Sequence, residues 1–326
     1  MRKIAIIGAG FAGLSVAWHL QQFPHYQATL FDPVGIGGGA SGVSTGLLYP
    51  FPGRLALRSW LATEAMQASL ALLHVVEETL GRTVALRNGI YRIAVHPAQR
   101  KAFYERSLQN PEALWKANVQ KEIPLAIEAP GLWIPSAVTV FSKPYLEGLW
   151  LACQKRGVIL QKTKIDSLQC VDAYDVAVVC AGADIFKFPE CAHLSLTPVK
   201  GQTIICRWNQ DIQCSVSGLG HITPTEEPGF CQMGSTYEHQ SMDTETTKEA
   251  VQELFDKIGA FYPSALRFQP VHQTAGIRMA RKTGYRPIAE QISPRTFVFT
   301  GLGSRGLLYH ALLGERVAMQ IHNLLK

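Results

Sequence analysis

The apolar and polar positions at the start of the chain predict a strand, a tight turn, a helix and a second strand. The run from Lys3 to Ile7 has the apolar character of a short buried strand, and a glycine-rich turn follows it at 8–13. A helix is predicted from about Gly10 to Gln21, and an apolar strand from Ala28 to Phe31 ends at Asp32. This order is typical of a parallel βαβ unit.

Later segments repeat this mixture of helices and strands. A stripe of apolar residues at helical spacing predicts a long helix over 57–80, namely Leu57, Leu61, Ala65, Ala68, Leu72 and Val76. Residues 89–95 alternate like a half-buried strand, whereas 175–180 form a continuous apolar run that suits a strand buried on both faces. The last unit is a strand over 296–300, a glycine turn and a helix over 307–325.

Further elements are predicted between these units. They are a helix around Phe103, a proline-punctuated stretch over 111–135, a helix over 145–156, strands beginning at 157 and covering 203–206 and 229–237, and a helix over 244–261. Together the elements predict an α/β protein in which a Rossmann-type, doubly wound nucleotide-binding domain is interrupted by a mostly antiparallel α+β substrate domain. We expect the first domain to comprise 1–87, 141–195 and 271–326, and the second 88–140 and 196–270.

The first glycine turn has the spacing of a dinucleotide-binding site. Gly8 would permit the tight turn, Gly10 would let a pyrophosphate approach the backbone, and Gly13 would allow the helix to pack closely on the strand. The helix N-terminus, at Phe11 and Ala12, would offer N–H groups to the phosphates. Asp32 would accept hydrogen bonds from the adenosine ribose. The alternative is an ordinary glycine turn without a ligand.

Two further segments favour FAD over NAD. The loop over 35–42 adds flexible backbone, with Ser41 and Gly42 able to contact phosphates. The stretch over 300–310 provides a second helix N-terminus, whose dipole would stabilise negative charge on a reduced flavin ring. The candidate cofactor residues there are Gly301, Gly303, Ser304, Arg305, Gly306 and Leu307, and Ala181 and Gly182 follow the buried strand. A loop that serves helix packing alone is the alternative.

The composition of the chain indicates which partners and which cellular compartment to expect. The net charge of +6 is compatible with an anionic cofactor or a nucleic-acid partner. The seven cysteines include no CxxC pair, which favours a reducing compartment and gives no metal site. We expect Cys180, which lies inside an apolar run, to be buried like a small apolar residue. No uninterrupted apolar run is long enough to span a membrane. We therefore expect a soluble, cytoplasmic protein.

Seven segments resemble the D-amino-acid-oxidase-like family of FAD-dependent oxidoreductases, which includes glycine and sarcosine oxidases. In chain order they read IIGAGFAGL, GASG, VVCAGA, PVKGQ, MGSTYE, AGIRMA and TGLGSRGL. Three of them, extended as SGVSTGLLYP, AGIRMARKTGYRPI and TGLGSRGL, are similar to the oxidoreductase half of the bifunctional bacterial enzymes that make 5-methylaminomethyl-2-thiouridine in tRNA. That half removes the carboxymethyl group from 5-carboxymethylaminomethyl-uridine at the wobble position.

The resemblance implies a fold, a cofactor and a reaction. FAD would be bound without a covalent link, because no cysteine lies near the segments that would face its ring. Hydride transfer from the carbon beside an amine would give an imine that water hydrolyses. Arg278 would bind the substrate carboxylate through two parallel N–H groups of its guanidinium. The alternative is that Arg278 forms an ion pair between the domains. Tyr49, Tyr237 and Arg305 would line the flavin or substrate pocket.

The sequence departs from the tRNA enzymes at two points. The first strand begins so near the N-terminus that we expect no preceding methyltransferase domain. The segment after Arg278 reads MARKTGYRPIAE, where the family usually has an acid before the proline and a glycine after it, whereas here Gly284 and Glu290 lie in that neighbourhood. His239 is a candidate to point into the pocket, His310 is expected to be a satisfied core or surface histidine, and a solvated turn charge is an equal alternative for Lys200.

Three functions remain open. A tRNA-modifying oxidoreductase would need a basic surface beside its entrance, for which the candidates are Arg54, Arg58, Arg281, Lys282, Arg286 and Arg305. A small-molecule amino-acid or amine oxidase acting on glycine, sarcosine or a D-amino acid would need only a closed pocket. A redox-inert flavoprotein would bind tRNA or a protein without turnover.

Overall fold

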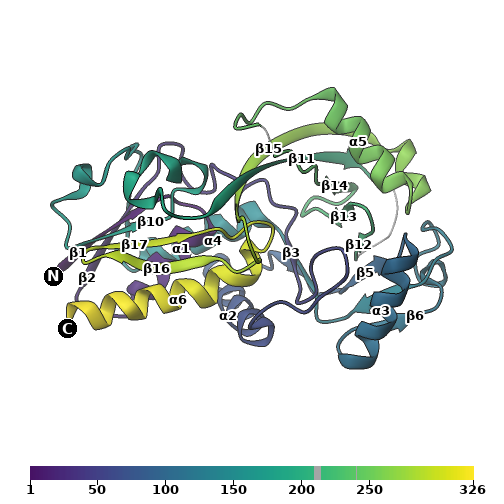
Figure 1. The fold of residues 1–326 in the computed structure, drawn as a ribbon, viewed down its shortest axis with the longest axis horizontal. Coiled ribbons are helices and arrows are strands. Elements are labelled where there is room, and N and C mark those ends of the chain that lie inside the picture. Colours follow the sequence, from purple (N-terminus) through teal and green to yellow (C-terminus); the bar gives the residue numbers. More distant parts are fainter. Residues whose placement is uncertain (209–213, 240) are drawn as a thin grey trace.

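The computed structural model describes residues 1–208, 214–239 and 241–326, in two sheet-based halves that lie side by side (Figure 1). The α-helices are α1 (Phe11–Leu20), α2 (Ala62–Leu80), α3 (Pro97–Gln109), α4 (Ser142–Lys155), α5 (Lys248–Gly259) and α6 (Gly306–Leu325). The 3-10 helices are η1 (Val119–Lys121), η2 (Leu168–Val171), η3 (Gly182–Lys187), η4 (Pro189–Cys191) and η5 (Pro263–Arg267).

The first half contains a six-stranded sheet of the doubly wound type. Its order is β16 (Ile288–Ser293), β17 (Thr296–Thr300), β10 (Val176–Val179), β1 (Arg2–Ile7), β2 (Tyr26–Phe31) and β9 (Ile159–Gln161). All neighbours are parallel except β16 and β17. The predicted βαβ unit is therefore present, with Ile4 of β1 opposite Ala28 of β2. β10 is buried on both faces, as its apolar run predicts.

The two faces of this sheet pack against different layers. On one face, Ile4 and Ile6 join Phe297 and Phe299 in a core completed by α1, α2, α4 and α6. On the other face, Ala5 and Ile7 pack with side chains from 165–196. Alternation along each strand explains this division, because successive side chains point to opposite faces.

The second half contains an eight-stranded, mostly antiparallel sheet. Its order is β15 (Gln269–Arg281), β11 (Leu196–Arg207), β14 (Phe230–Gly234), β13 (His221–Pro224), β12 (Ser215–Ser217), β5 (Ile90–Ile93), β7 (Gly131–Ile134) and β6 (Leu114–Lys116). Its one parallel pairing in the described residues is β12 with β5. The remaining strands form a three-stranded sheet in the order β3 (Leu47–Leu48), β8 (Val138–Val140) and β4 (Ala85–Leu86).

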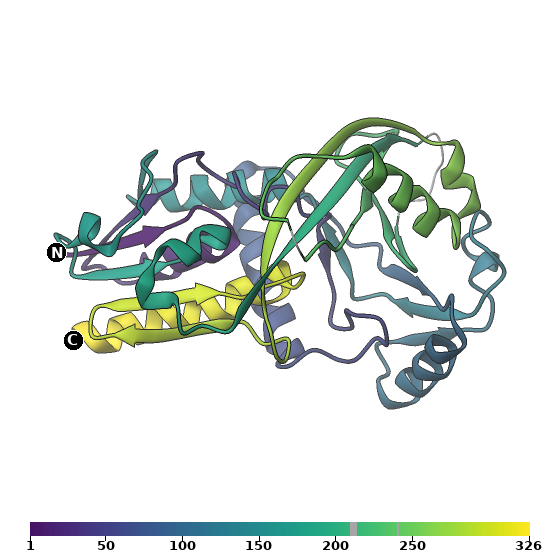
Figure 2. The same ribbon diagram turned by 45° about the horizontal axis from the view of Figure 1, so that its top comes forward.

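Two long strands connect the halves. β11 and β15 pair over almost their whole length within the eight-stranded sheet, and one end of the pair lies beside the six-stranded half, as Figure 2 shows. The fold class expected from the sequence is thus confirmed. The division into two domains stays a prediction, although its boundary at 271 falls inside β15, which pairs along the eight-stranded sheet.

Several element boundaries differ from the prediction. The helix expected from Leu57 begins only at Ala62, because Ala56 and Leu61 adopt left-handed backbone with φ of 50° and 46°. The strand expected to be half-buried at 89–95 is buried on both faces over Ile90–Ile93. The helix expected from Thr244 begins at Lys248, where the Thr247 hydroxyl accepts a hydrogen bond from the Ala250 N–H and caps it.

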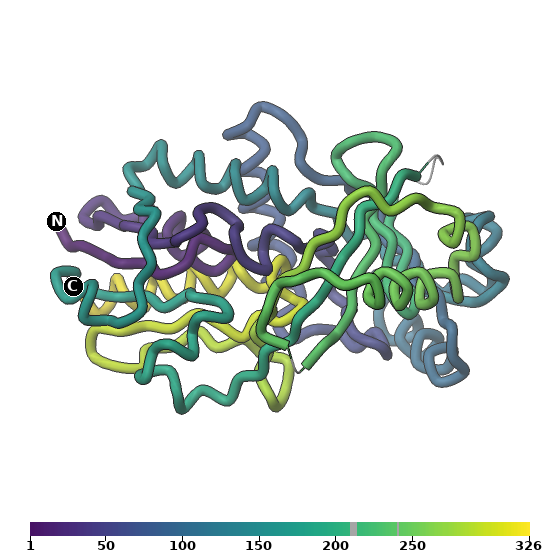
Figure 3. The backbone as a smooth tube through the Cα atoms, turned by 90° about the horizontal axis from the view of Figure 1, so that it is seen from above, coloured from purple at the N-terminus to yellow at the C-terminus, as the bar shows by residue number. Residues whose placement is uncertain are grey.

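Both termini lie at the same end of the molecule, on the six-stranded half, as the tube in Figure 3 shows. All seven cysteines are free, and Cys180 is buried as expected. Among the described residues, none of the helices combines the length and the apolar character that crossing a bilayer requires.

Candidate FAD and substrate site

A cavity of about 490 Å³ lies at the carboxyl ends of the parallel strands, beside β11 and β15. Its lining includes the residues that follow β1, β2, β10 and β17, four neighbouring strands of the six-stranded sheet. Ligands of open α/β sheets bind at this edge. A volume of this size is within the usual range of small-molecule and cofactor sites.

The first glycine turn is shaped by close backbone contacts. Gly8 has a φ of +111°, and a Cβ placed on it would lie 2.3 Å from the Cys180 carbonyl oxygen. A Cβ on Gly13 would lie 1.9 Å from the Gly8 carbonyl oxygen, so α1 can approach β1 only without a side chain there. Both positions require glycine for the turn itself, as predicted from the spacing.

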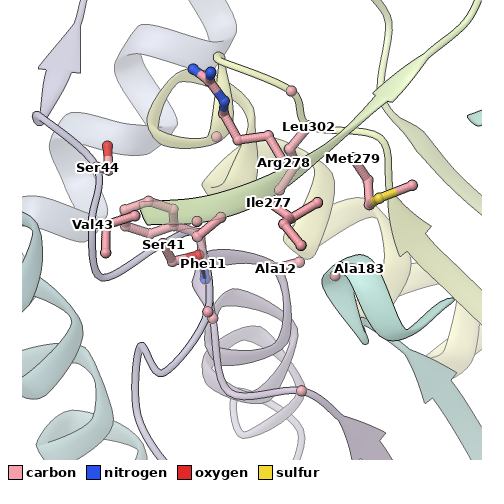
Figure 4. Close-up of a pocket in the computed structure, with 18 of the residues that line it drawn as sticks. Phe11, Ala12, Ser41, Val43, Ser44, Ala183, Ile277, Arg278, Met279 and Leu302 are labelled. Atoms are coloured by element: carbon pink, nitrogen blue, oxygen red, sulfur yellow. Dashed lines mark hydrogen bonds between the residues drawn. The ribbon is translucent and has the colours of Figure 1, made fainter. Parts of the chain in front are cut away.

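Ser41 completes the start of α1. Its hydroxyl accepts a hydrogen bond from the Phe11 N–H at 3.1 Å, and a Cβ on Gly10 would come within 2.8 Å of the same oxygen. Phe11, Ala12 and Ser41 gather at one end of the cavity in Figure 4, with Ile277 pointing toward Ala12 from β15. The first turn of α1 therefore faces the cavity beside a side-chain hydroxyl.

Asp32 organises the backbone around the cavity. One carboxylate oxygen accepts a hydrogen bond from the Ala9 N–H at 2.9 Å. The other accepts hydrogen bonds from the N–H groups of Val34 and Gly35 at 3.0 and 2.8 Å. A carboxylate has further lone pairs to offer, so these bonds leave acceptor capacity toward the cavity.

The terminal turn forms the opposite wall. Gly301 and Gly303 have φ values of +72° and +53°, which only glycine adopts without strain, and the Gly303 N–H donates to the Met279 carbonyl at 2.8 Å. The first residues of α6, Gly306 and Leu307, line the cavity. A second helix N-terminus thus faces the same space, as the sequence predicts.

Most of the predicted cofactor residues meet at this cavity. Those that line it are Gly8, Gly10, Phe11, Ala12, Asp32, Ser41, Ala181, Gly182, Gly301, Gly303, Ser304, Arg305, Gly306 and Leu307. Gly13 and Gly42 are outside the lining. Gly42 instead packs its own loop, because a Cβ there would lie 2.1 Å from the Gly37 carbonyl oxygen.

Arg278 occupies the other end of the cavity. Figure 4 shows its side chain leaving β15 on the side opposite to Ile277. Its guanidinium donates to the Ser235 hydroxyl at 3.2 Å and to the Thr236 carbonyl at 3.0 Å, and lies 4.6 Å from the centre of the Tyr237 ring. It forms no ion pair with any acidic side chain in the described ranges, so its charge is held in place but not neutralised.

Gly201 makes room for this guanidinium. It lies on β11, next to the strand that carries Arg278, and it also lines the cavity. A Cβ on Gly201 would lie 2.4 Å from Nη2 of Arg278. The glycine of the PVKGQ segment therefore makes room for the guanidinium in the site, a role that its sequence context alone does not indicate.

The other predicted substrate residues line the same end. Tyr49, Tyr237 and Arg305 all border the cavity, and Tyr237 is half-exposed at its rim. Burial raises the pKa of Tyr49, while Arg92 and Arg305 lower it to a smaller extent. Tyr49 is therefore a neutral hydrogen-bonding group at physiological pH.

His221, which no sequence pattern singles out, lines the cavity from β13. Its Nε2 lies 2.7 Å from the Thr45 hydroxyl. Burial, followed by the nearby Arg278 charge, lowers its pKa to about 4, so the imidazole is neutral at pH 7. Only the fold could identify this residue, since its short strand lacks a periodic signal in the sequence.

The structure gives the burial and contacts of three side chains whose positions the sequence leaves open. His239 is exposed and outside the cavity lining. His310 is a core histidine: its Nδ1 donates to the Leu307 carbonyl at 3.0 Å, and Nε2 accepts from the Tyr145 hydroxyl at 2.5 Å. Lys200 is 3% exposed and donates to Asp243 at 2.6 Å, so the alternative of a solvated turn charge is wrong.

The fold and the site define a class of protein. The family of FAD dependent oxidoreductases (DAO) matches residues 3–320, and the chain belongs to it. The N-termini of α1 and α6, which both line the cavity, and Asp32, whose carboxylate keeps acceptor capacity toward it, fit the phosphates and the ribose of FAD. Among the described residues, no cluster of histidine, cysteine or acidic side chains could hold a metal ion.

The curated relatives include enzymes of tRNA modification. The chain is 25% identical to the tRNA 5-methylaminomethyl-2-thiouridine biosynthesis bifunctional protein MnmC of Marinobacter nauticus, over 98% of this chain and 55% of that protein. It is 24% identical to the protein of the same name from Azoarcus sp., over 98% of this chain and 57% of that protein. The chain thus spans about half the length of these relatives.

Solved structures share the whole fold. Glycine oxidase from Geobacillus kaustophilus is 20% identical with a TM-score of 0.85, over 99% of this chain and 95% of that one. Iminodiacetate oxidase from Chelativorans sp. BNC1 is 20% identical with a TM-score of 0.83, over 98% of this chain and 95% of that one. The chain is therefore an FAD-dependent oxidoreductase with the fold of these oxidases.

Proposed function

We propose that this oxidoreductase oxidises a C–N bond next to a carboxylate, and that it removes the carboxymethyl group from 5-carboxymethylaminomethyl-uridine at the wobble position of tRNA. The observation that carries the proposal is Arg278, a cation in the cavity wall without an acidic partner in the part of the chain that the structure describes. A carboxylate is the ligand that such a guanidinium prefers, because two parallel N–H groups match its two oxygens.

The residues around Arg278 position a carboxymethylamine rather than react with it. Ser235 and Thr236 fix the guanidinium, and Tyr237 supports it through its ring. The carboxylate held there would orient the adjacent CH₂ group toward the part of the cavity bordered by the glycine turns. Such fixed orientation is a large part of what an enzyme contributes to a reaction.

A bound FAD supplies the two-electron acceptor that this oxidation needs. The substrate loses two electrons and two protons to become an imine, and addition of water then cleaves it to the primary amine and glyoxylate. We propose Tyr49, Tyr237 and Arg305 as the further substrate residues, and His221 as a neutral hydrogen-bonding partner.

Support for tRNA as the substrate comes from the curated relatives, whose names state that they act in tRNA modification. The second candidate is an oxidase of small amino acids, which the structural likeness to glycine oxidase favours. Glycine, sarcosine and the modified uridine all present an amine beside a carboxylate, so Arg278 serves each of them equally. The reaction product separates these candidates.

The test is product analysis with the purified holoenzyme. Transfer RNA carrying 5-carboxymethylaminomethyl-uridine is incubated with the enzyme, digested to nucleosides and examined by mass spectrometry. We expect conversion to 5-aminomethyl-uridine with one glyoxylate per modified nucleoside, and loss of both products in Arg278→Gln. Unchanged tRNA, together with glyoxylate formed from glycine or sarcosine, would establish the second candidate instead.

A further inference from the structure

Beside the cavity, a row of stacked side chains begins at Arg305 and continues over the surface. The Arg305 guanidinium lies 4.6 Å from the centre of the Tyr285 ring. The next residue, Arg286, lies 5.0 Å from the centre of the Trp60 ring, and Arg316 of α6 lies 5.8 Å from the same ring. We call Arg305, Tyr285, Arg286, Trp60 and Arg316 the arginine–aromatic row.

The charges of this row are not neutralised. Arg286, Arg305 and Arg316 form no ion pair with an acidic side chain among residues 1–208, 214–239 and 241–326. Arg58, another candidate for a basic surface, is different because its guanidinium is paired with Glu112 at 3.0 Å. The row therefore presents three available cations, each held beside an aromatic ring.

The row also offers a stacking surface. Tyr285 is 76% exposed, although tyrosine normally buries much of its ring. The turn that carries it is held at Lys282, whose N–H donates to the Ser195 carbonyl at 3.0 Å. Trp60 is anchored at its own carbonyl, which accepts a hydrogen bond from the Tyr309 hydroxyl at 2.9 Å. These hydrogen bonds attach the backbone at Lys282 and at Trp60 to the rest of the fold.

The row is continuous with the cavity. Arg305 lines the cavity, whereas Tyr285, Arg286, Trp60 and Arg316 lie outside its lining. A Cβ placed on Gly53, another lining residue, would come within 3.9 Å of Nη2 of Arg305. A chain of nucleotides with one base in the cavity would therefore meet the row at its next positions.

We infer that the arginine–aromatic row binds the single-stranded nucleotides that flank the substrate base, taking their phosphates on its arginines and stacking a neighbouring base on Tyr285. This inference rests on the proposed function and identifies the surface that would make the enzyme selective for RNA over a free amino acid. Single-stranded nucleic acids are recognised by this combination of exposed aromatic faces and cationic side chains. A site for a small amino acid would need no such surface.

The test uses the FAD-loaded full chain and two substrates with the same reacting group. One is a synthetic RNA stem-loop with 5-carboxymethylaminomethyl-uridine at the wobble position, and the other is the free nucleoside. The rate of flavin reduction is measured under anaerobic conditions at several substrate and salt concentrations, for wild type, Tyr285→Ala, Tyr285→Phe, Arg286→Gln and Arg316→Gln. Arg267→Gln is the matched control, since Arg267 is an exposed arginine outside the row.

We expect the apparent Kd for the stem-loop to rise about tenfold in Tyr285→Ala, and Tyr285→Phe to retain wild-type affinity because it keeps the ring. Each arginine replacement should reduce the slope of log K against log salt by about 0.7, the value for one phosphate contact on a single strand. Reduction by the nucleoside should change less than twofold in the row variants, and Arg267→Gln should resemble wild type with both substrates.

Two results would overturn the inference in distinguishable ways. If the stem-loop reduces the flavin equally well in wild type and in all the row variants, the row is not the RNA surface, although the proposed function stands. If neither the stem-loop nor the nucleoside reduces the wild-type flavin, the proposed function fails and the inference fails with it.

Discussion

Replacement of Gly201 by alanine tests whether the position of Arg278, and not merely its charge, determines activity. The added Cβ would lie 2.4 Å from Nη2 and 2.8 Å from Cζ of Arg278, whereas ordinary contacts begin at 3.4 Å. The guanidinium must therefore move by about 1 Å. The backbone of Gly201 has no positive φ that would strain an alanine, and the added Cβ would lie 3.2 Å from the Thr236 carbonyl oxygen, a contact that a shift of a few tenths of an ångström relieves, so the fold itself should tolerate the change.

A displacement of about 1 Å in a positioning group can cost about a hundredfold in rate, which corresponds to about 3 kcal/mol of transition-state stabilisation. We expect Gly201→Ala to lower the rate of flavin reduction divided by the substrate Kd by this factor for any carboxylate-bearing substrate. FAD content and Tm should remain close to wild type, because the contact lies on a side chain that can move. Stopped-flow reduction under anaerobic conditions measures the first quantity.

A double-mutant cycle shows whether the effect operates through Arg278. In an Arg278→Gln background, the guanidinium that the added Cβ would displace is absent. Gly201→Ala should therefore cause little further change in the rate of flavin reduction divided by the substrate Kd. An equal loss in both backgrounds would refute the reasoning, because the alanine would then act elsewhere in the cavity. Unchanged kinetics in the single variant would refute it as well, since Arg278 could then bind substrate from the displaced position.

Three further predictions follow from the same structure. Gly13→Ala should reduce both FAD content and Tm although Gly13 does not line the cavity, because its Cβ would lie 1.9 Å from the Gly8 carbonyl oxygen; normal flavin absorbance per chain would contradict this. The fall of the His310 pKa from 6.5 to about 4, caused by burial, corresponds to about 3 kcal/mol of stability that is present above pH 6.5 and is lost as the pH falls toward 4. His310→Asn should therefore lose less Tm than wild type between pH 7 and pH 4, and parallel Tm curves would refute this. Acid precipitation should release FAD into the supernatant, and flavin retained in the pellet would show a covalent link.

The sequence predicts best where backbone geometry itself requires a residue type. The first glycine turn and the turn at 300–306 could be located because φ values of +111° at Gly8 and +72° at Gly301 are costly for other residues. The buried strand β10 could be located because both of its faces are covered, which leaves a continuous apolar run.

The sequence predicts poorly where long-range contacts override local pattern. β15 is exposed over its first four residues and owes its strand conformation to pairing with β11, so local periodicity gives no signal for it. Lys200 is buried because Asp243, distant in sequence, neutralises it. His221 faces the cavity for the same kind of reason, since β13 is placed there by its pairing with β12 and β14.

The central claim is that a carboxymethylamine on tRNA, bound through Arg278, is the electron donor. The most direct test is anaerobic bleaching of the flavin absorbance of the purified holoenzyme, with tRNA carrying 5-carboxymethylaminomethyl-uridine compared with glycine, sarcosine and D-alanine. We predict bleaching by the tRNA and not by the amino acids, and its loss in Arg278→Gln. Bleaching by a free amino acid and not by the tRNA would contradict the account.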